Sequence, residues 1–202
     1  MIVSEEYEHG LQVAHLNLMI KDYENTIDQQ TGKGTTQVYT SYNDTSFKHY
    51  DFFGSAHNIA VNQDSGYAYI MGPGYAGCNN SNTTTALLII YNLDSIGDTL
   101  DVPTCYTNST DPYYHDIQAV MYSGPDEEHT GKEIIIASAG QSGGSNDIAI
   151  LDASDKNNTT EIGRFDGDAD FNGAAEDIQY SHQGWLTGDH RYFFFDDQLD
   201  KY

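Results

Sequence analysis

The chain has 202 residues, enough for one sizeable domain, and its 38% of hydrophobic residues can form a core. It carries 31 Asp and Glu against 8 Lys and Arg, a formal net charge of −23, which repels nucleic acids and anionic lipid surfaces and disfavours both as partners. No apolar run approaches the roughly 20 residues of a membrane span, and the N-terminus shows no signal peptide. Direct membrane insertion by this segment is therefore not expected.

Short apolar or alternating runs, bounded by Gly, Asn and Asp, recur along the whole chain and predict β-strands. A sustained helical period is absent. In chain order, the expected strands are GLQVAHLNLM, TQVYTSY, HNIAVN, GYAYIMG, ALLIIYNLD, HDIQAVMY, KEIIIASAG, DIAILDASD, TEIGRF and HRYFFFDD. The sequence therefore predicts an all-β protein.

These runs repeat in groups of four, and His57, His115 and His182 each begin a group. A group consists of a His-led strand, a turn, an apolar strand, a loop, a strand ending in Asn or Asp, and an outer strand. This order is typical of β-propeller blades made of four antiparallel strands. The chain, 1–202, is then a single propeller segment with blade-like units at about 1–50, 57–107 and 115–166 and a started unit at 182–202.

The last of these units gives Ser181 to Asp197 the place of the first hairpin of a blade, with Gly188 and Asp189 in its turn. Propellers close with typically four to eight blades, whereas this chain holds about three blades' worth of strands. Three blades would leave long unpaired edges, which native sheets avoid. We therefore expect an internal piece of a longer protein, or a chain that other chains complete through self-association.

Several stretches resemble the choice-of-anchor B family, whose propellers are built from LVIVD-type repeats. They are EHGLQV, HNIAVNQDSGYAYIMG, YYHDIQAVMYSGPDEEHTGKEI and SHQGWLTGDHRYFFFDDQLD. The resemblance spans nearly the whole chain and implies an exported or surface-tethered protein with no established activity. It also implies a protein that continues beyond both ends of this sequence. The chain departs from the family pattern at HDIQA and EIIIA, where the family usually carries cysteines.

Two features bear on an extracellular or cell-surface location. Cys78 and Cys105 alone are compatible with one disulfide or two free thiols; the resemblance and their places in one blade-like unit imply a Cys78–Cys105 disulfide. Asn-x-Ser/Thr sequons suggest glycosylation, although loops rich in Asn and Thr also create sequons by composition. The candidate glycosylation sites are Asn43, Asn79, Asn82, Asn108, Asn157 and Asn158.

The histidines that begin the groups are the main ligand candidates. In a propeller the first strand of each blade lines the central channel, so His57, His115 and His182, with Asp116, could bind a transition metal or an anionic ligand there. In the structural alternative, each histidine hydrogen-bonds the backbone of a neighbouring blade and fixes the junction. The sequence leaves both interpretations open.

A calcium site is predicted in DADFNGAAEDIQ, because its start has the D-x-[DN]-x-[DN]-G pattern of an EF-type loop. Gln179 stands where such a loop has its bidentate glutamate, so calcium affinity should be weak. The alternative is a solvated acidic loop in an acidic chain. The candidate ligands are Asp168, Asp170, Asn172, the backbone carbonyl of Ala174, and Glu176.

The chain is thus expected to be a binding or structural module, with extracellular proteins or glycans as partners. A G-x-S-x-G motif is absent, and the adjacent Asp196 and Asp197 should point to opposite faces of a strand. An enzyme is therefore disfavoured. The alternatives are a polysaccharide-acting hydrolase or lyase with a site at the propeller rim, and a subunit of an extracellular assembly.

Overall fold

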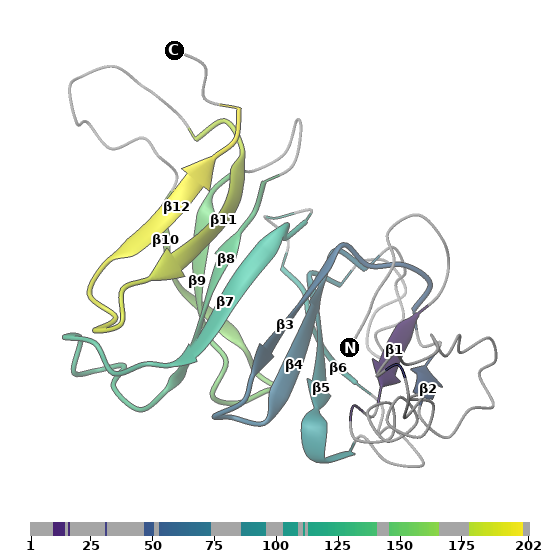
Figure 1. The fold of residues 1–202 in the computed structure, drawn as a ribbon. Coiled ribbons are helices and arrows are strands. Elements are labelled where there is room, and N and C mark those ends of the chain that lie inside the picture. The colour runs from purple at the N-terminus through teal and green to yellow at the C-terminus, as the bar shows by residue number, and fades with distance from the viewer. Residues whose placement is uncertain are drawn as a thin grey trace.

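A computed structural model describes residues 10–14, 16, 31, 47–50, 53–73, 86–95, 103–108, 111, 113–140, 146–165 and 178–199. Across these residues the protein is all-β, apart from the helical residue Leu16 and a short 3₁₀ turn, η1, at Leu93–Ser95 (Figure 1). Within the same residues, no helix has the length and apolar character that crossing a membrane requires. The predicted fold class is therefore confirmed at the level of an all-β protein.

The first four-stranded sheet contains β3 (Asn58–Asn62), β4 (Tyr67–Met71), β5 (Leu88–Asn92) and β6 (Thr104–Tyr106). Its strands are antiparallel and follow their order in the chain. The central strands β4 and β5 are almost entirely buried, which explains why they read as continuous apolar runs instead of alternating ones. The predicted strands HNIAVN, GYAYIMG and ALLIIYNLD are thus confirmed.

The second four-stranded sheet repeats this plan with β7 (Asp116–Met121), β8 (Glu133–Ser138), β9 (Ile148–Asp152) and β10 (Thr160–Phe165). The third strands of both sheets end in the same kind of turn. Asn92 Oδ1 accepts the N–H of Asp94 at 2.9 Å, and Asp152 Oδ1 accepts that of Ser154 at 3.1 Å. A short polar side chain here turns the backbone by bonding two residues ahead.

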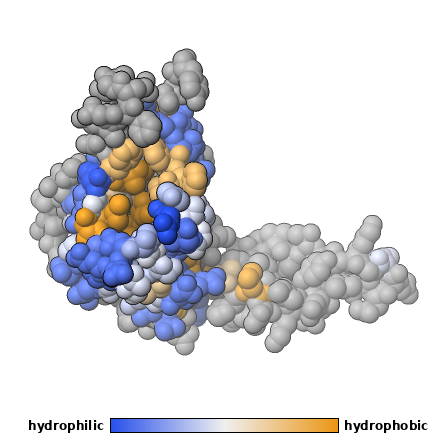
Figure 2. Space-filling view, turned by 90° about the vertical axis from the view of Figure 1, so that its left-hand side faces the viewer, coloured by the Kyte–Doolittle hydropathy of each residue, from blue (hydrophilic) through white to orange (hydrophobic). Residues whose placement is uncertain are grey.

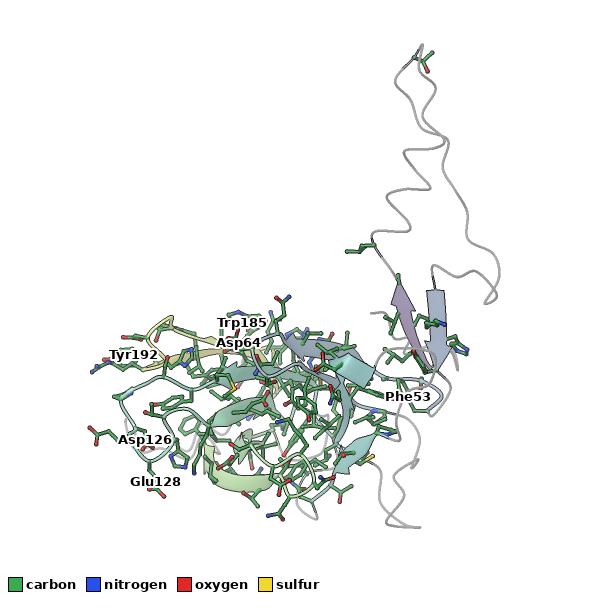
Figure 3. The ribbon with its side chains drawn as sticks, turned by 90° about the horizontal axis from the view of Figure 1, so that it is seen from below. Phe53, Asp64, Asp126, Glu128, Trp185 and Tyr192 are labelled. Carbon is green, nitrogen blue, oxygen red and sulfur yellow. The ribbon has the colours of Figure 1, made fainter. Side chains whose placement is uncertain are left out.

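Two smaller sheets flank this pair. β11 (Ser181–Leu186) and β12 (Phe193–Asp197) form the predicted hairpin, whose turn contains Gly188 and Asp189. At the other side, β1 (Leu11–Ala14) pairs with β2 (Phe47–Tyr50). Phe53 lies beside β1 and β2, at the opposite end of the view from Tyr192 of the hairpin (Figure 3).

The first blade-like unit was the least accurate prediction. A strand at Phe47–Tyr50 was not predicted. The expected GLQVAHLNLM strand is present over Leu11–Ala14 and was wrong at Leu16, which is helical. The TQVYTSY run lies outside the described residues. The physical reason for the missed strand is that FKHY is short and polar, so its pairing with β1 depends on tertiary packing and not on a sequence period.

The four sheets pack face to face in chain order. β3 lies against β7, and β7 lies against β11, so the first strands of three successive units are neighbours (Figure 1). Asn58 Nδ2 donates to Asp116 Oδ1 at 3.2 Å, and the N–H of Leu186 donates to Gln118 Oε1 at 2.7 Å. Over the described residues the sheets do not close into a ring.

A buried carboxylate joins the first sheet to the second. Glu133, on β8, is 2% exposed. Its Oε1 accepts bonds from Asn62 Nδ2, Ser65 Oγ and Tyr69 Oη, each at 2.7 Å. Its Oε2 accepts Lys156 Nζ at 2.6 Å. Because three partners belong to the first sheet and its turn, this network fixes how the two sheets meet.

A second ionic network lies at the outer strand of the second sheet. All five N–H donors of Arg164 are used: two bond Asp111 at 2.8 and 2.7 Å, two bond Glu161 at 2.8 and 2.6 Å, and one bonds Asp147 at 3.0 Å. Asp111 also accepts the hydroxyl of Tyr114 at 3.1 Å. Burial opposes ionisation of Asp111, but its bonds to Arg164 and its other donors hold its pKa below the usual value.

Candidate functional site

The three group-leading histidines lie at equivalent places in successive sheets. His57 and His115 directly precede β3 and β7, and His182 is the second residue of β11. The N–H of His57 donates to the carbonyl of Met71 at 3.0 Å, and that of His115 donates to the carbonyl of Ser138 at 2.8 Å. Met71 and Ser138 are the last residues of the second strands of their sheets. The backbones of His57 and His115 are therefore held in the same way in both repeats.

Because the first strands lie side by side, the imidazole rings come together in a row. The ring centroids of His57 and His115 are 4.1 Å apart, and those of His115 and His182 are 4.4 Å apart. All three side chains are half-buried. The structure therefore brings together the three histidines that the sequence singled out.

Two tyrosines, which the sequence reasoning missed, extend this row. The ring of Tyr113 lies 5.9 Å from that of His57, and the ring of Tyr180 lies 5.5 Å from that of His115. Each tyrosine stands two residues before a group-leading histidine, as Tyr-x-His. This repeated spacing was the signal that could have found them. We call the five rings of His57, Tyr113, His115, Tyr180 and His182 the ring strip.

Two glycines make room for the strip. Gly72 and Gly140 follow the second strands of the first and second sheets. A Cβ at Gly72, which has φ +57°, would meet the ring of Tyr113, and one at Gly140 would overlap the carbonyl oxygen of Ser181. A glycine is therefore needed just after the second strand of each sheet, at Gly72 one residue after β4 and at Gly140 two residues after β8.

Hydrogen bonds in the strip agree with the structural alternative for one of the histidines. His115 Nδ1 lies 2.8 Å from the carbonyl oxygen of His182, in the neighbouring sheet. His182 Nδ1 lies 3.7 Å from Asp196 Oδ2 on its own hairpin. Asp116, directly after His115, accepts the side chain of Asn58 from the first sheet. The strip is thus also a joint between sheets.

Asp116 is the carboxylate closest to the strip in sequence and has a perturbed pKa. Burial raises its pKa above the ordinary aspartate value, while the N–H of Ile117 and the nearby His182 and His57 oppose that shift. The Ile117 N–H is 2.8 Å from Asp116 Oδ1. The charged form of Asp116 is therefore destabilised in the folded state.

We expect Asp116→Asn to raise the melting temperature at pH 7, because asparagine keeps an oxygen for Ile117 and Asn58 without a buried charge. A raised carboxyl pKa contributes stability at low pH that is lost as the pH rises through it. The gain of the variant should therefore shrink as the pH falls toward ~4. Circular dichroism melts between pH 3.5 and 7.5 measure this.

The exposed Asp64 provides the control, because Asp64→Asn removes one negative charge from the same acidic chain. An equal gain in both variants, or a gain for Asp116→Asn that does not change with pH, would contradict the assignment to burial.

A metal centre is not evident at the strip. In the part of the chain that the structure describes, no group of three or more His, Cys, Asp or Glu side chains has the arrangement to hold a metal ion. The neighbouring imidazole rings are tilted against each other, with interplanar angles of 48° for His57 and His115 and 37° for His115 and His182. What the strip offers chemically is half-buried ring faces beside imidazole, phenol and carboxyl hydrogen-bonding groups.

The adjacent carboxylates of Asp196 and Asp197 do not share a site, as a pair of glycosidase carboxylates would have to. Asp197 accepts the N–H groups of Gln179 and Tyr180 at 2.8 and 2.9 Å. Asp196 lies near His182 instead. The two neighbouring carboxylates therefore act separately, as the strand geometry predicted.

The structure describes only some of the residues of the remaining predicted sites. Cys105 lies on β6 opposite Ile89, whereas Cys78 lies outside the described residues, so the disulfide stays a prediction. The calcium candidates Asp168, Asp170, Asn172, Ala174 and Glu176 also lie outside them, as do the sequons at Asn43, Asn79 and Asn82.

Three sequons are described. Asn157 and Asn158 are exposed. Asn108 is half-buried, and its Nδ2, the atom that a glycan would occupy, donates to Asp111 at 2.8 Å. A glycan on Asn108 would displace that bond, so Asn157 and Asn158 fit glycosylation better.

No family model, curated protein or solved structure matches this chain. The resemblance to the choice-of-anchor B family therefore stays a prediction.

Proposed function

We propose that this chain is part of an extracellular or cell-surface β-propeller that serves as a binding and structural module. The observation that carries this proposal is the side-by-side arrangement of β3, β7 and β11. Adjacent first strands, each followed outward by antiparallel partners, are what radially arranged blades require. Membership of the choice-of-anchor B family, a Cys78–Cys105 disulfide, glycosylation and weak calcium binding at 168–179 belong to the same proposal.

The ring strip is the proposed binding surface, and a neutral glycan is the proposed ligand. The apolar faces of sugar rings pack on aromatic rings, while their hydroxyls bond imidazole, phenol and carboxyl groups. The strip supplies all of these groups in a half-buried setting. The net charge of −23 disfavours anionic polysaccharides by repulsion.

Affinity electrophoresis through gels containing neutral polysaccharides tests this proposal. We expect retardation of the full chain by at least one polysaccharide, and its loss in the double variant Tyr180→Ala, His182→Ala. Trp185→Ala is the matched control, because Trp185 lies on the same hairpin, is 58% exposed and is not part of the strip.

Analysis of the polysaccharide after incubation separates binding from catalysis. The proposal predicts no new reducing ends and no unsaturated products. Release of such products would favour the hydrolase or lyase alternative. Retardation that survives the double variant would remove the strip as the binding surface, and an absence of retardation would overturn glycan binding.

A further inference from the structure

The two faces of the second sheet are covered unequally. One face packs on the four strands of the first sheet, and the other packs on the two strands of the hairpin. Beneath the hairpin, Ile134 is 4% exposed; farther out, on β10, Ile162 and Phe165 are each 41% exposed. Figure 2 shows the resulting apolar hollow, surrounded by polar residues. We call this uncovered area the open face.

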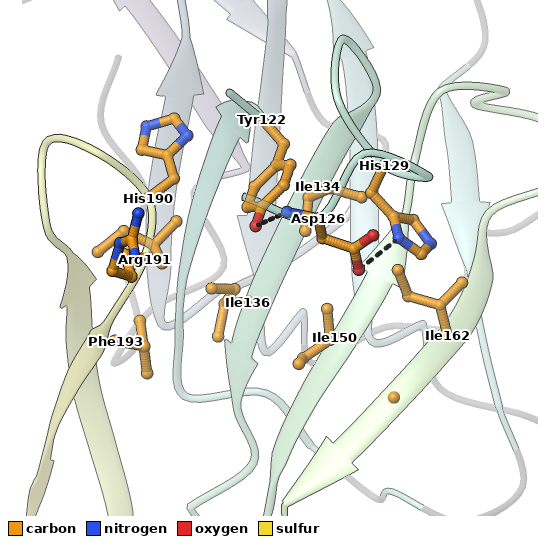
Figure 4. A pocket seen from close by; sticks show the side chains of 12 residues that line it. Tyr122, Asp126, His129, Ile134, Ile136, Ile150, Ile162, His190, Arg191 and Phe193 are labelled. Atoms are coloured by element: carbon orange, nitrogen blue, oxygen red, sulfur yellow. Dashed lines mark hydrogen bonds and ion pairs between the residues drawn. The ribbon is translucent and has the colours of Figure 1, made fainter. Parts of the chain in front are cut away.

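A cavity of about 310 Å³ lies in the open face. Its floor is formed by isoleucines of the second sheet, including Ile150 and Ile162, and Phe193 of β12 forms part of its wall (Figure 4). Asp126 and His129, bonded to each other at 3.0 Å, lie at its rim. The cavity is thus apolar inside and polar at its edge.

The outer edge of β12 borders this cavity. β12 pairs with β11, and over the described residues no strand pairs with its other side. Phe195, also on β12, packs edge-on against Phe165 at 6.0 Å between ring centroids. An exposed strand edge beside an apolar hollow is a template for one more strand.

The internal repeat indicates which strand belongs there. When the sheets are aligned on their leading histidines, Phe193 takes the place of Ala68 in the first sheet and of Ile135 in the second. The residues opposite those two are Tyr91 on β5 and Leu151 on β9. Both point toward the preceding unit and are 1% and 0% exposed.

We propose that an extended segment with the chemistry of β5 and β9 adds to the outer edge of β12 and covers the open face. Its residue opposite Phe193 is a large apolar one that fills the cavity, and its last residue is Asp or Asn. This inference rests on the proposed function and specifies one partner of the structural module: a short apolar strand of defined register.

A fluorescently labelled peptide, DIAILDASD, which copies residues 147–155, probes this edge. We expect it to bind the full chain in an anisotropy titration and to increase the protection of β12 amides from hydrogen exchange. Replacing its leucine with aspartate should weaken binding at least tenfold. Replacing its second isoleucine with serine should have little effect, because alternate residues face away.

The protein side of the test uses two exposed apolar residues. Ile162→Glu, in the cavity floor, should weaken peptide binding at least tenfold, whereas Val61→Glu, on β3 and 46% exposed, should not. Both variants should retain the far-ultraviolet circular dichroism of the parent chain, since both positions are already exposed.

Three outcomes would overturn the inference. The first is equal peptide binding by the Ile162→Glu and Val61→Glu variants. The second is peptide-induced protection from hydrogen exchange at strands other than β12. The third is a dimer of the chain that forms without peptide and buries β12. If the peptide fails to bind while polysaccharide retardation persists, the strand-addition site is removed and the proposed function stands.

Discussion

Glu133→Ala is expected to lower the free energy of unfolding by about 3–5 kcal/mol, the usual cost of leaving one partner of a buried ion pair uncompensated. Lys156 Nζ is 2.6 Å from the carboxylate, and the side chain of Lys156 is only 11% exposed. Asn62 and Tyr69 would also lose their acceptor. Burial and the bond to Glu133 raise the pKa of Tyr69, so its hydroxyl stays protonated and needs an acceptor.

Urea denaturation of the full chain measures this loss. Glu127→Ala is the matched control: it removes the same charge from an exposed turn and should change stability by less than about 0.5 kcal/mol. Glu133→Gln keeps an oxygen that can accept from the donors of the first sheet. Its loss of stability should therefore lie between those of Glu133→Ala and Glu127→Ala. An effect of Glu133→Ala no larger than that of Glu127→Ala would show that the network does not hold the sheets together.

Arg164→Met is expected to lower the free energy of unfolding by a similar amount, about 3–5 kcal/mol at pH 7, because it leaves Asp111 buried without its bidentate partner. The Asp111 side chain is 0% exposed, and Asp147 and Glu161 would become uncompensated beside it. Arg164→Lys should recover only part of the loss, since an ammonium cannot supply five donors in a planar fork.

The pH dependence separates this effect from lost packing. A lowered carboxyl pKa contributes stability above the unfolded value of about 3.9 that disappears as the pH falls through the folded value. Burial opposes ionisation of Asp111, but Arg164 and the other donors lower its pKa. The difference in unfolding free energy between wild type and Arg164→Met should therefore be full near pH 7 and shrink below about pH 4.

Arg191→Met controls for the loss of a positive charge in this acidic chain. Arg191 is 55% exposed and its Nε lies 3.7 Å from Asp189, so its removal should cost less than about 1 kcal/mol. A difference for Arg164→Met that stays constant down to pH 3 would assign the loss to packing and not to the ion pairs.

The ring strip shows how far a repeat alone can lead. The recurrence of His57, His115 and His182 predicted that their side chains would meet, and the structure brings them together. The same sequence contained Tyr-x-His before His115 and His182, and a glycine within two residues of the end of β4 and of β8, but their role was not recognised. A tyrosine or glycine in a strand protein is common, so only the contact across two sheets distinguishes these positions.

The sequence by itself determined the strands and their grouping. Alternation and buried apolar runs are local properties, and the Asn or Asp that ends each third strand acts on the backbone two residues away. From the His57 position onward, the local patterns therefore predicted β3 to β5, β7 to β10, and the hairpin of β11 and β12 with its turn.

Only the tertiary structure decided which polar groups meet. Glu133 is separated from Asn62 by 71 positions in the sequence, and Arg164 from Asp111 by 53. No sequence-spacing rule predicts a contact over such separations. A glutamate in KEIIIASAG and an arginine in TEIGRF look like ordinary solvated charges on a strand. Once buried by packing, these charged side chains connect neighbouring parts of the structure, because a charge removed from water must pair with groups inside the protein.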